Sequence, residues 1–208
     1  ALLNRTGQHQ WFTVKGGSIQ YVDRLNRELV ERNVALRLGD PIKEVKRGPL
    51  GVQISSQKSD FEYFDHVVFA THSDDTLKML VDADQRESKA LDAIKYQPNQ
   101  AVLHHDENVM PKSKNCWASW VYTEDKKRSL GPIGLTYWMN SLQPIPEVDP
   151  MFVTLNSKNK IDPYKIYDEV TFRHPVYDLP ALEAQKDLSD NNGQRNTWFC
   201  GAWMKNGF

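Results

Sequence analysis

One apolar stretch constrains the fold of this chain more than any other feature of the sequence. In DHVVFATHS (65–73), four apolar residues follow one another at 67–70. A strand with one wet face alternates, whereas a continuous apolar run predicts a strand covered on both faces. The run ends at Ala70-Thr71, and open α/β sheets bind ligands at the carboxyl ends of their strands. Ala70 would let a ligand approach and Thr71 could donate a hydrogen bond to it, although an ordinary strand end fits equally well.

Apolar spacing predicts helices and strands on both sides of this stretch. Apolar residues recur every three or four positions over 18–33, which predicts an amphipathic helix that Ser18 caps and Asn33 ends. Further helices are predicted at 84–95, at 179–189 and in a short segment containing Leu77 and Leu80, and strands at 34–38, in a hairpin over 42–56 and at 197–203.

Between residues 96 and 172 the pattern changes to short alternating pieces. AVLHH, CWASWVY, GLTYWMN and MFVTLN are separated by polar or proline-rich loops such as QPIPEVDP. Such a series is typical of an antiparallel sheet, and it predicts a second domain.

The totals exclude several classes of protein. The 208 residues include 26 basic and 27 acidic ones, so no net field attracts nucleic acid. No apolar run approaches the length of a membrane span. Cys116 and Cys200 form no metal-binding spacing and are expected to be reduced and buried, which favours the cytoplasm.

Taken in order, these pieces resemble the flavin-containing amine oxidase-type flavoproteins, in particular their bacterial branch of predicted NAD/FAD-binding proteins. The resemblance lies in Gly-Gly before a helix, VVFATHSDDTLKML, LTYWMNSLQ, FRHPVYD and RNTWFCGAW. It implies a mixed α/β and α+β fold. Residues 1–95 and 179–208 would form part of a Rossmann-like FAD-binding domain with a three-stranded β-meander. Residues 96–178 would form an antiparallel substrate domain with helices.

Two departures from the family pattern imply that the sequence is a fragment of a longer flavoenzyme. The GxGxxG segment that binds the pyrophosphate is absent from the 208 residues. After Gly207-Phe208 the family usually continues with an HEDG-type segment beside the flavin, and that segment is missing too. Where the family tends to have Gly-Tyr-Gly-Phe, this chain reads Lys205-Asn206-Gly207-Phe208. By this resemblance the longer protein binds FAD, and the fragment binds it weakly or not at all.

The resemblance also implies which residues lie at the cofactor. Small residues or backbone groups would approach it, and Trp203 would flank the flavin ring. The same positions also fit a tight helix-entry turn, a bend between strands and a core tryptophan. The expected cofactor-binding residues are Gly16, Gly17, Pro41, Ile42, Ala70, Thr71, Gly201, Ala202 and Trp203.

Aromatic residues of the predicted substrate domain are the candidates for a substrate pocket. Aromatic walls exclude water and offer π faces to an apolar or cationic substrate. Tyr137 and Trp138 are adjacent in a strand and point to opposite sides, so at least half of the set is expected to be ordinary packing. The expected substrate-binding residues are Trp117, Trp120, Tyr137, Trp138 and Asn140.

The sequence favours no metal and names no catalytic side chain. His104, His105, Asp106 and Glu107 resemble a metal cluster, but adjacent strand residues diverge. The expected activity is hydride transfer from a small-molecule or acyl-chain substrate to the flavin, as in an amine oxidase. The alternatives are a lipid or polyene desaturase or saturase on the same scaffold, and a non-catalytic binding module.

Overall fold

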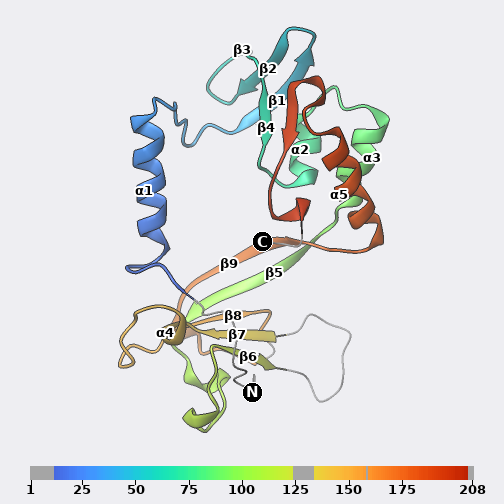
Figure 1. Cartoon of the computed structure of the whole chain (residues 1–208). Helices are drawn as coiled ribbons and strands as arrows, with labels where there is room; N and C mark the ends of the chain where they lie inside the picture. Colours follow the sequence, from blue (N-terminus) through green and yellow to red (C-terminus); the bar gives the residue numbers. More distant parts are fainter. Residues whose placement is uncertain (1–11, 124–133, 158, 206–208) are drawn as a thin grey trace, which may run out of the picture. The chain divides into compact units, whose positions relative to one another are not determined.

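The computed structural model describes residues 12–123, 134–157 and 159–205 of the chain. The chain divides into two compact units (Figure 1). The sheet unit comprises residues 1–36 and 99–172, and the turn unit comprises residues 37–98 and 173–208. This division differs from the predicted domain boundaries chiefly in grouping residues 1–36 with the five-stranded sheet.

The turn unit contains the predicted hairpin, extended into a three-stranded meander. Strands β1 (Ile42–Gly48), β2 (Gly51–Ser56) and β3 (Glu62–Phe64) pair antiparallel in the order β1-β2-β3. Gly51 has φ of 142°, and a Cβ at this position would lie 2.5 Å from the carbonyl oxygen of Phe64. Only glycine lets the two strands approach each other here.

The apolar run at 67–70 contains β4 (Val67–Phe69), which pairs parallel with β10 (Thr197–Phe199). The rings of Phe69 and Phe199 stack at 5.7 Å between centroids. Val68, in contrast, is 61% exposed. The expectation that this strand is covered on both faces is therefore wrong for the described part of the chain.

Three helices complete the turn unit: α2 (Ser73–Met79), α3 (Gln85–Ala93) and α5 (Leu179–Asn191). A capping box begins α3, because the Asp84 side chain accepts from the Glu87 N–H and the Glu87 carboxylate accepts from the Asp84 N–H. Leu91 and Leu188 are fully buried in one apolar core with the β4 and β10 phenylalanines. This core holds the ends of both strands in place.

A buried arginine ties the meander to α3. The side chain of Arg47 is 1% exposed, and its guanidinium donates to Glu87 Oε1 at 2.5 Å and to Asp82 Oδ1 at 3.0 Å. Arg195 adds a second cation to Asp82 at 2.8 Å. Burying a charge is costly unless it is paired and fully hydrogen-bonded, and Arg47 meets both conditions.

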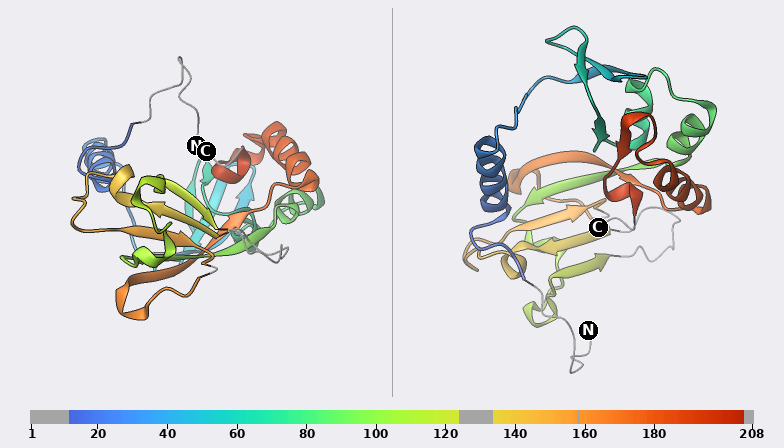
Figure 2. Two further views of the ribbon diagram at one scale, coloured as in Figure 1. Left: turned by 90° about the horizontal axis from the view of Figure 1, so that it is seen from below. Right: turned by 45° about the horizontal axis from the view of Figure 1, so that its top comes forward.

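The sheet unit is built on a five-stranded sheet. Its strands are β5 (Tyr96–His104), β6 (Trp120–Thr123), β7 (Gly134–Trp138), β8 (Phe152–Leu155) and β9 (Ile166–Pro175), in the order β6-β7-β8-β5-β9. Strands β5 and β9 lie side by side and each continues into the turn unit (Figure 2). The connections of the sheet unit contain the short helices η1 (Glu107–Val109), η2 (Lys114–Cys116), α4 (Met139–Leu142) and η3 (Pro163–Lys165). In the turn unit, η4 (Gln194–Asn196) precedes β10 and η5 (Ala202–Met204) follows it.

Helix α1 (Ser18–Glu31) confirms the predicted amphipathic helix, and Asn33 with φ of 59° follows its end. Its cap is Gly17 without a side-chain hydrogen bond, so the expected Ser18 cap is wrong. The predicted strand at 34–38 is also wrong: these residues are irregular and exposed, and no described strand pairs with them. Among the described residues, no helix has the length and apolarity that a membrane span requires.

Replacement of Arg47 tests the importance of the buried ion cluster. The substitution Arg47→Ala leaves the Asp82 and Glu87 carboxylates without their main cation, and loss of one partner of a buried pair costs about 3–5 kcal/mol. We expect this loss in the free energy of unfolding of the turn unit, measured by urea titration with hydrogen exchange in the hairpin. Arg37→Ala, which removes the exposed pair with Glu62, is the matched control and should change little. Equal stability of the two variants would contradict the assignment.

Candidate functional site

The carboxyl ends of β4 and β10 meet at one edge of the parallel pair. The register continues past the strands, because the Cys200 N–H donates to the carbonyl of Phe69 at 2.9 Å. The indole N–H of Trp203 then donates to the carbonyl of Thr71 at 2.9 Å. The turns at Ala70-Thr71 and Gly201-Ala202 therefore lie together, and all four residues are exposed. We call these four residues the paired turns.

Gly201 makes this approach possible. Its φ is 131°, a conformation that side chains disfavour, and a Cβ would lie 3.2 Å from Nε1 and 3.3 Å from Cδ1 of the Trp203 ring. Because Gly201 has no side chain, the Trp203 ring can lie close to its main chain, and this main chain is exposed at the strand end. The structure thus offers a place where a ligand can approach the main chain closely.

Trp203 and Thr71 use their polar groups within the protein. Trp203 is 2% exposed and belongs to the core, so its ring supports the paired turns from the core side. Thr76 donates its hydroxyl proton to the carbonyl of His72 at 2.9 Å, so the 2.8 Å contact between Thr71 and Thr76 requires Thr71 to be the donor. This arrangement leaves the Thr71 oxygen as an acceptor, and the expected hydrogen bond from Thr71 to a ligand stays a prediction.

The other expected cofactor residues have separate places. Gly16 and Gly17 both have φ of 85° and form a turn before α1 in the sheet unit, where the Gly17 N–H donates to the carbonyl of Val14 at 3.0 Å. Pro41 and Ile42 begin β1, and the carbonyl of Pro41 accepts from the Gln57 N–H at 2.9 Å. Gly16 and Gly17 thus have the geometry of a tight helix-entry turn, and Pro41 and Ile42 have that of a bend at the start of a strand.

Two of the expected substrate residues pack into the core of the sheet unit. Trp138 lies opposite Phe152 in the β7–β8 register and packs against the buried cluster around it. Trp117 meets Trp138 edge-on at 5.3 Å and Phe152 at 5.7 Å, while its indole N–H donates to the carbonyl of Pro111 at 2.8 Å. Both tryptophans are accounted for by packing.

The opposite face of the sheet carries the other two aromatic candidates. Trp120 and Tyr137 are cross-strand partners with rings edge-on at 6.5 Å, and Trp120 is 41% exposed. Burial, and next the neighbouring Tyr122, raises the pKa of Tyr137, so its hydroxyl stays neutral. Alternation along the paired strands places Leu103, Trp120, Tyr122, Leu135, Tyr137 and Val153 on this face, which we call the aromatic face.

Asn140, the fifth substrate candidate, stabilises a loop. Its Nδ2 donates to the carbonyls of Pro146 and Asp149, each at 2.8 Å, and its Oδ1 accepts from the Met151 N–H at 2.8 Å. These bonds occupy the polar atoms that a substrate contact would need.

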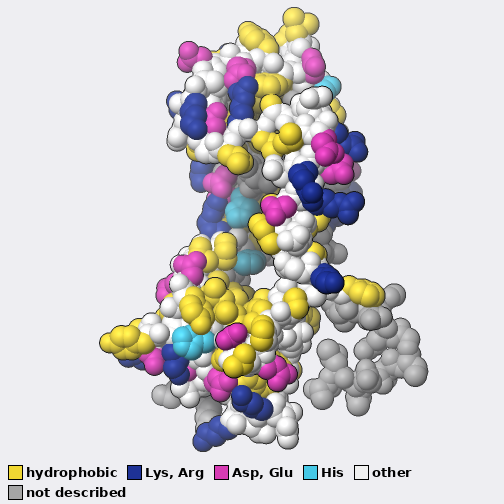
Figure 3. Space-filling view, turned by 90° about the vertical axis from the view of Figure 1, so that its left-hand side faces the viewer, with side chains coloured by type: hydrophobic (Ala, Val, Ile, Leu, Met, Phe, Trp, Pro, Cys, Tyr) yellow, Lys and Arg dark blue, Asp and Glu magenta, His cyan; other side chains and the backbone are white. Residues whose placement is uncertain are grey.

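In the space-filling view, hydrophobic side chains gather on the surface of the sheet unit (Figure 3).

The histidine and acidic residues at 104–107 form a structural network. His104 is fully buried, its Nδ1 accepts from the Asp106 N–H at 3.0 Å, and its Nε2 lies 2.8 Å from Thr154 Oγ1. Burial lowers the pKa of His104 more than the Asp106 carboxylate raises it. Burial also raises the pKa of Asp106, but hydrogen bonds led by those from Asp162 and Lys165 outweigh it and hold this pKa at about 2.

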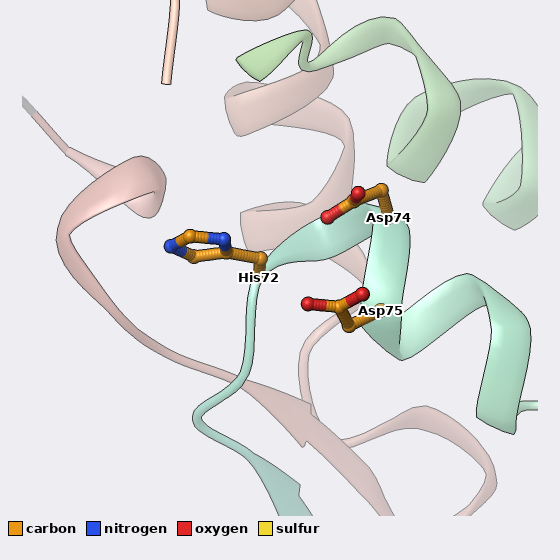
Figure 4. A group of neighbouring side chains, drawn as sticks. All are labelled: His72, Asp74 and Asp75. Carbon is orange, nitrogen blue, oxygen red and sulfur yellow. The ribbon is translucent and has the colours of Figure 1, made fainter. Parts of the chain in front are cut away.

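A different acidic group has the spacing of a metal site. Ligand atoms of His72, Asp74 and Asp75 at the start of α2 lie within 4.8 Å of one another (Figure 4). Both carboxylates are already paired with Arg173, and Lys78 lies 2.9 Å from Asp75. These cations supply the positive charge that a metal would bring. This group was not predicted, although the sequence places His72, Asp74 and Asp75 together at the start of a predicted helix.

Comparison with known proteins fits this geometry. The family model of flavin-containing amine oxidoreductases matches residues 2–137. No curated protein matches the chain. One similar solved structure is a CLA-producing fatty acid isomerase from P. acnes, with 16% identity over 78% of this chain and a TM-score of 0.54. A second is reduced UDP-galactopyranose mutase, with 12% identity over 91% of this chain and a TM-score of 0.62. A third is a putrescine oxidase mutant with redesigned cofactor binding, with 10% identity over 92% of this chain and a TM-score of 0.59. The chain covers 42%, 47% and 48% of these proteins, respectively.

The buried His104 makes a pH-dependent contribution to stability. Its folded pKa lies below the ordinary 6.5, so the contribution is complete above that pH and is lost as the pH falls through the unfolded value. We expect the unfolding midpoint of the sheet unit to fall between about pH 7 and pH 5. His104→Asn, which keeps an acceptor for the Asp106 N–H, should flatten this slope, and exposed His174→Gln should not. An unchanged slope in His104→Asn would contradict this account.

Proposed function

Since the chain belongs to the flavin-containing amine oxidoreductase family, we propose that it supplies part of the FAD site and the substrate wall of an FAD-dependent oxidoreductase. The observation that carries the proposal is the pair of exposed, small-residue turns at the carboxyl ends of two parallel strands. Such strand ends are the usual ligand site of open α/β sheets. At Gly201 no side chain covers the exposed main chain of this strand end.

In this proposal the paired turns contact the cofactor through backbone groups. Gly201 and Ala202 leave room for it, and the Thr71 oxygen accepts a hydrogen bond from it. Trp203 holds the two turns at a fixed separation through its bond to the Thr71 carbonyl. A flavin bound there would supply hydride acceptance, and the residues of this chain would supply orientation and exclusion of water.

Retention of FAD is proposed for a longer polypeptide that includes these residues. The glycine-rich segment that holds the pyrophosphate in this family does not occur among the 208 residues. The similar solved proteins are about twice as long as this chain. By this inference, the 208-residue chain alone binds FAD weakly or not at all.

The aromatic face is proposed as the wall of the substrate site. Trp120 and Tyr137 exclude water and present π faces, which suits a protonated amine or an apolar chain. An amine oxidase-type reaction is the first candidate, and it agrees with the family. The described aromatic face carries no carboxylate that would bind an amine, and this observation favours the second candidate, an enzyme acting on an acyl or polyene chain. A non-catalytic binding module remains the contrasting hypothesis.

Gly201 provides a direct test of the cofactor site. In the longer polypeptide, Gly201→Val should lower FAD affinity by about tenfold or more, or about 1.4 kcal/mol, because the side chain fills the approach to the turn. Gly48→Ala is the matched control, since a Cβ there makes only an ordinary 3.6 Å contact. The measurement is flavin titration followed by absorbance and tryptophan fluorescence. Absence of flavin binding in the unaltered longer polypeptide would favour the binding-module hypothesis.

Trp120 tests the substrate wall and separates the two substrate classes. Anaerobic bleaching of the flavin would be followed with primary amines and with unsaturated fatty acids. Trp120→Ala should raise the half-saturating concentration of the active class by about tenfold through lost apolar and π contact. Tyr164→Ala, at a 95% exposed position outside the aromatic face, is the control. If Trp120→Ala behaves like this control, the aromatic face is not the substrate wall.

A further inference from the structure

The two strands that continue from the sheet unit into the turn unit are anchored there at one place. The unit boundary crosses β5 between Pro98 and Asn99 and crosses β9 between Phe172 and Arg173. On the turn-unit side, the Val176 N–H donates to the carbonyl of Lys95 at 2.8 Å, so the two chain segments stay together. Tyr96 and Arg173 are the residues of these segments that reach α2.

Tyr96 fastens the first strand to the first residue of α2. Its hydroxyl accepts from the Ser73 N–H at 2.8 Å and donates to Ser73 Oγ at 3.1 Å. Ser73 is fully buried, so these bonds are shielded from water. The Tyr96 ring stacks on the His72 ring at 4.3 Å with an interplanar angle of 21°. One side chain thus fixes two consecutive residues of the helix start.

Arg173 fastens the second strand to the next two residues of the helix. Its guanidinium donates one nitrogen to Asp74 and another to Asp75. The same guanidinium lies over the Tyr96 ring, 5.5 Å from its centroid. Strand, ring and helix start are therefore joined by ionic, cation–π and hydrogen-bond contacts at once.

The anchored helix start is continuous with the paired turns. His72 directly follows Thr71, and the Thr71 hydroxyl donates to Thr76 in the first turn of α2. Thr76 in turn donates its N–H and its hydroxyl to the carbonyl of His72, at 2.8 and 2.9 Å. The Thr71 hydroxyl, the His72 carbonyl, the Ser73 N–H and the carboxylates of Asp74 and Asp75 thus all have partners in this helix turn or in Tyr96 and Arg173.

We propose that Tyr96 and Arg173 are positioning residues that couple the Ala70-Thr71 turn to the two strands leading from the five-stranded sheet. A displacement of β5 or β9 in the turn unit would then move the turn, because α2 cannot shift without breaking these bonds. The cofactor role of the turn rests on the proposed function. The mechanical link itself needs no cofactor.

Hydrogen exchange of the 208-residue chain, read by mass spectrometry, tests this link without flavin. Tyr96→Phe removes the acceptor of the Ser73 N–H, and Arg173→Gln removes the ion pairs. Each should speed exchange in peptides covering 70–76 by about fivefold, as expected when one net hydrogen bond of local stability is lost. Peptides of the 42–56 hairpin should keep their rates. Lys78→Gln is the matched control, because it removes the other cation beside Asp75 without touching either strand.

Two results would overturn the link. One is unchanged exchange at 70–76 in both variants, and the other is a uniform rise across the chain, which would indicate ordinary destabilisation. Arg173→Lys, which keeps the charge but cannot bind two carboxylates through a fork, should restore the rates only in part. In the FAD-loaded longer polypeptide, the visible circular dichroism of the flavin should change in Tyr96→Phe and Arg173→Gln but not in Lys78→Gln. Failure of that polypeptide to bind FAD would defeat the proposed function and leave the exchange result standing.

Discussion

The parallel pairing of β4 with β10 is the interaction on which the candidate site depends. These strands come from opposite ends of the turn unit in sequence, and each has only three residues. So short a pair is marginal by its own hydrogen bonds, and the stacked Phe69 and Phe199 rings bury it against α5 and α3. Because parallel strands end at the same edge, this pairing brings the turns that contain Thr71 and Gly201 together. The bond from Trp203 to Thr71 is a consequence of that pairing.

Local patterns predicted the elements that stabilise themselves or pair with near neighbours. The helix at 18–31, the hairpin and the core helices follow from apolar spacing and turn residues, which are properties of a few consecutive positions. The segment 34–38 alternates like a strand, but a strand needs a partner and its sequence does not reveal one. Strand β9 was missed for the opposite reason: nearly every residue of it is exposed, so no apolar pattern marks it, and only pairing with β5 defines it.

At the candidate site, the sequence predicted which face or turn a residue occupies more readily than what its side chain does. Alternation correctly predicted that Tyr137 and Trp138 lie on opposite faces of the sheet, because successive side chains of a strand point to opposite sides. It could not show that Asn140 is occupied by its own loop, or that the Thr71 and Thr76 hydroxyls contact each other, since both facts depend on contacts that form only in the folded chain. Family resemblance likewise marks Trp203 as a site residue without distinguishing a ring that touches a ligand from one that supports the backbone beside it.

If the paired turns contact a cofactor mainly through the main chain, their side chains are constrained by shape, and the chemistry must be controlled by where the turns are held. Trp203 holds them from the core side, and Tyr96 with Arg173 holds the helix that continues from Thr71. Ionic and aromatic contacts suit this second role, because they form a discrete arrangement that is either made or broken.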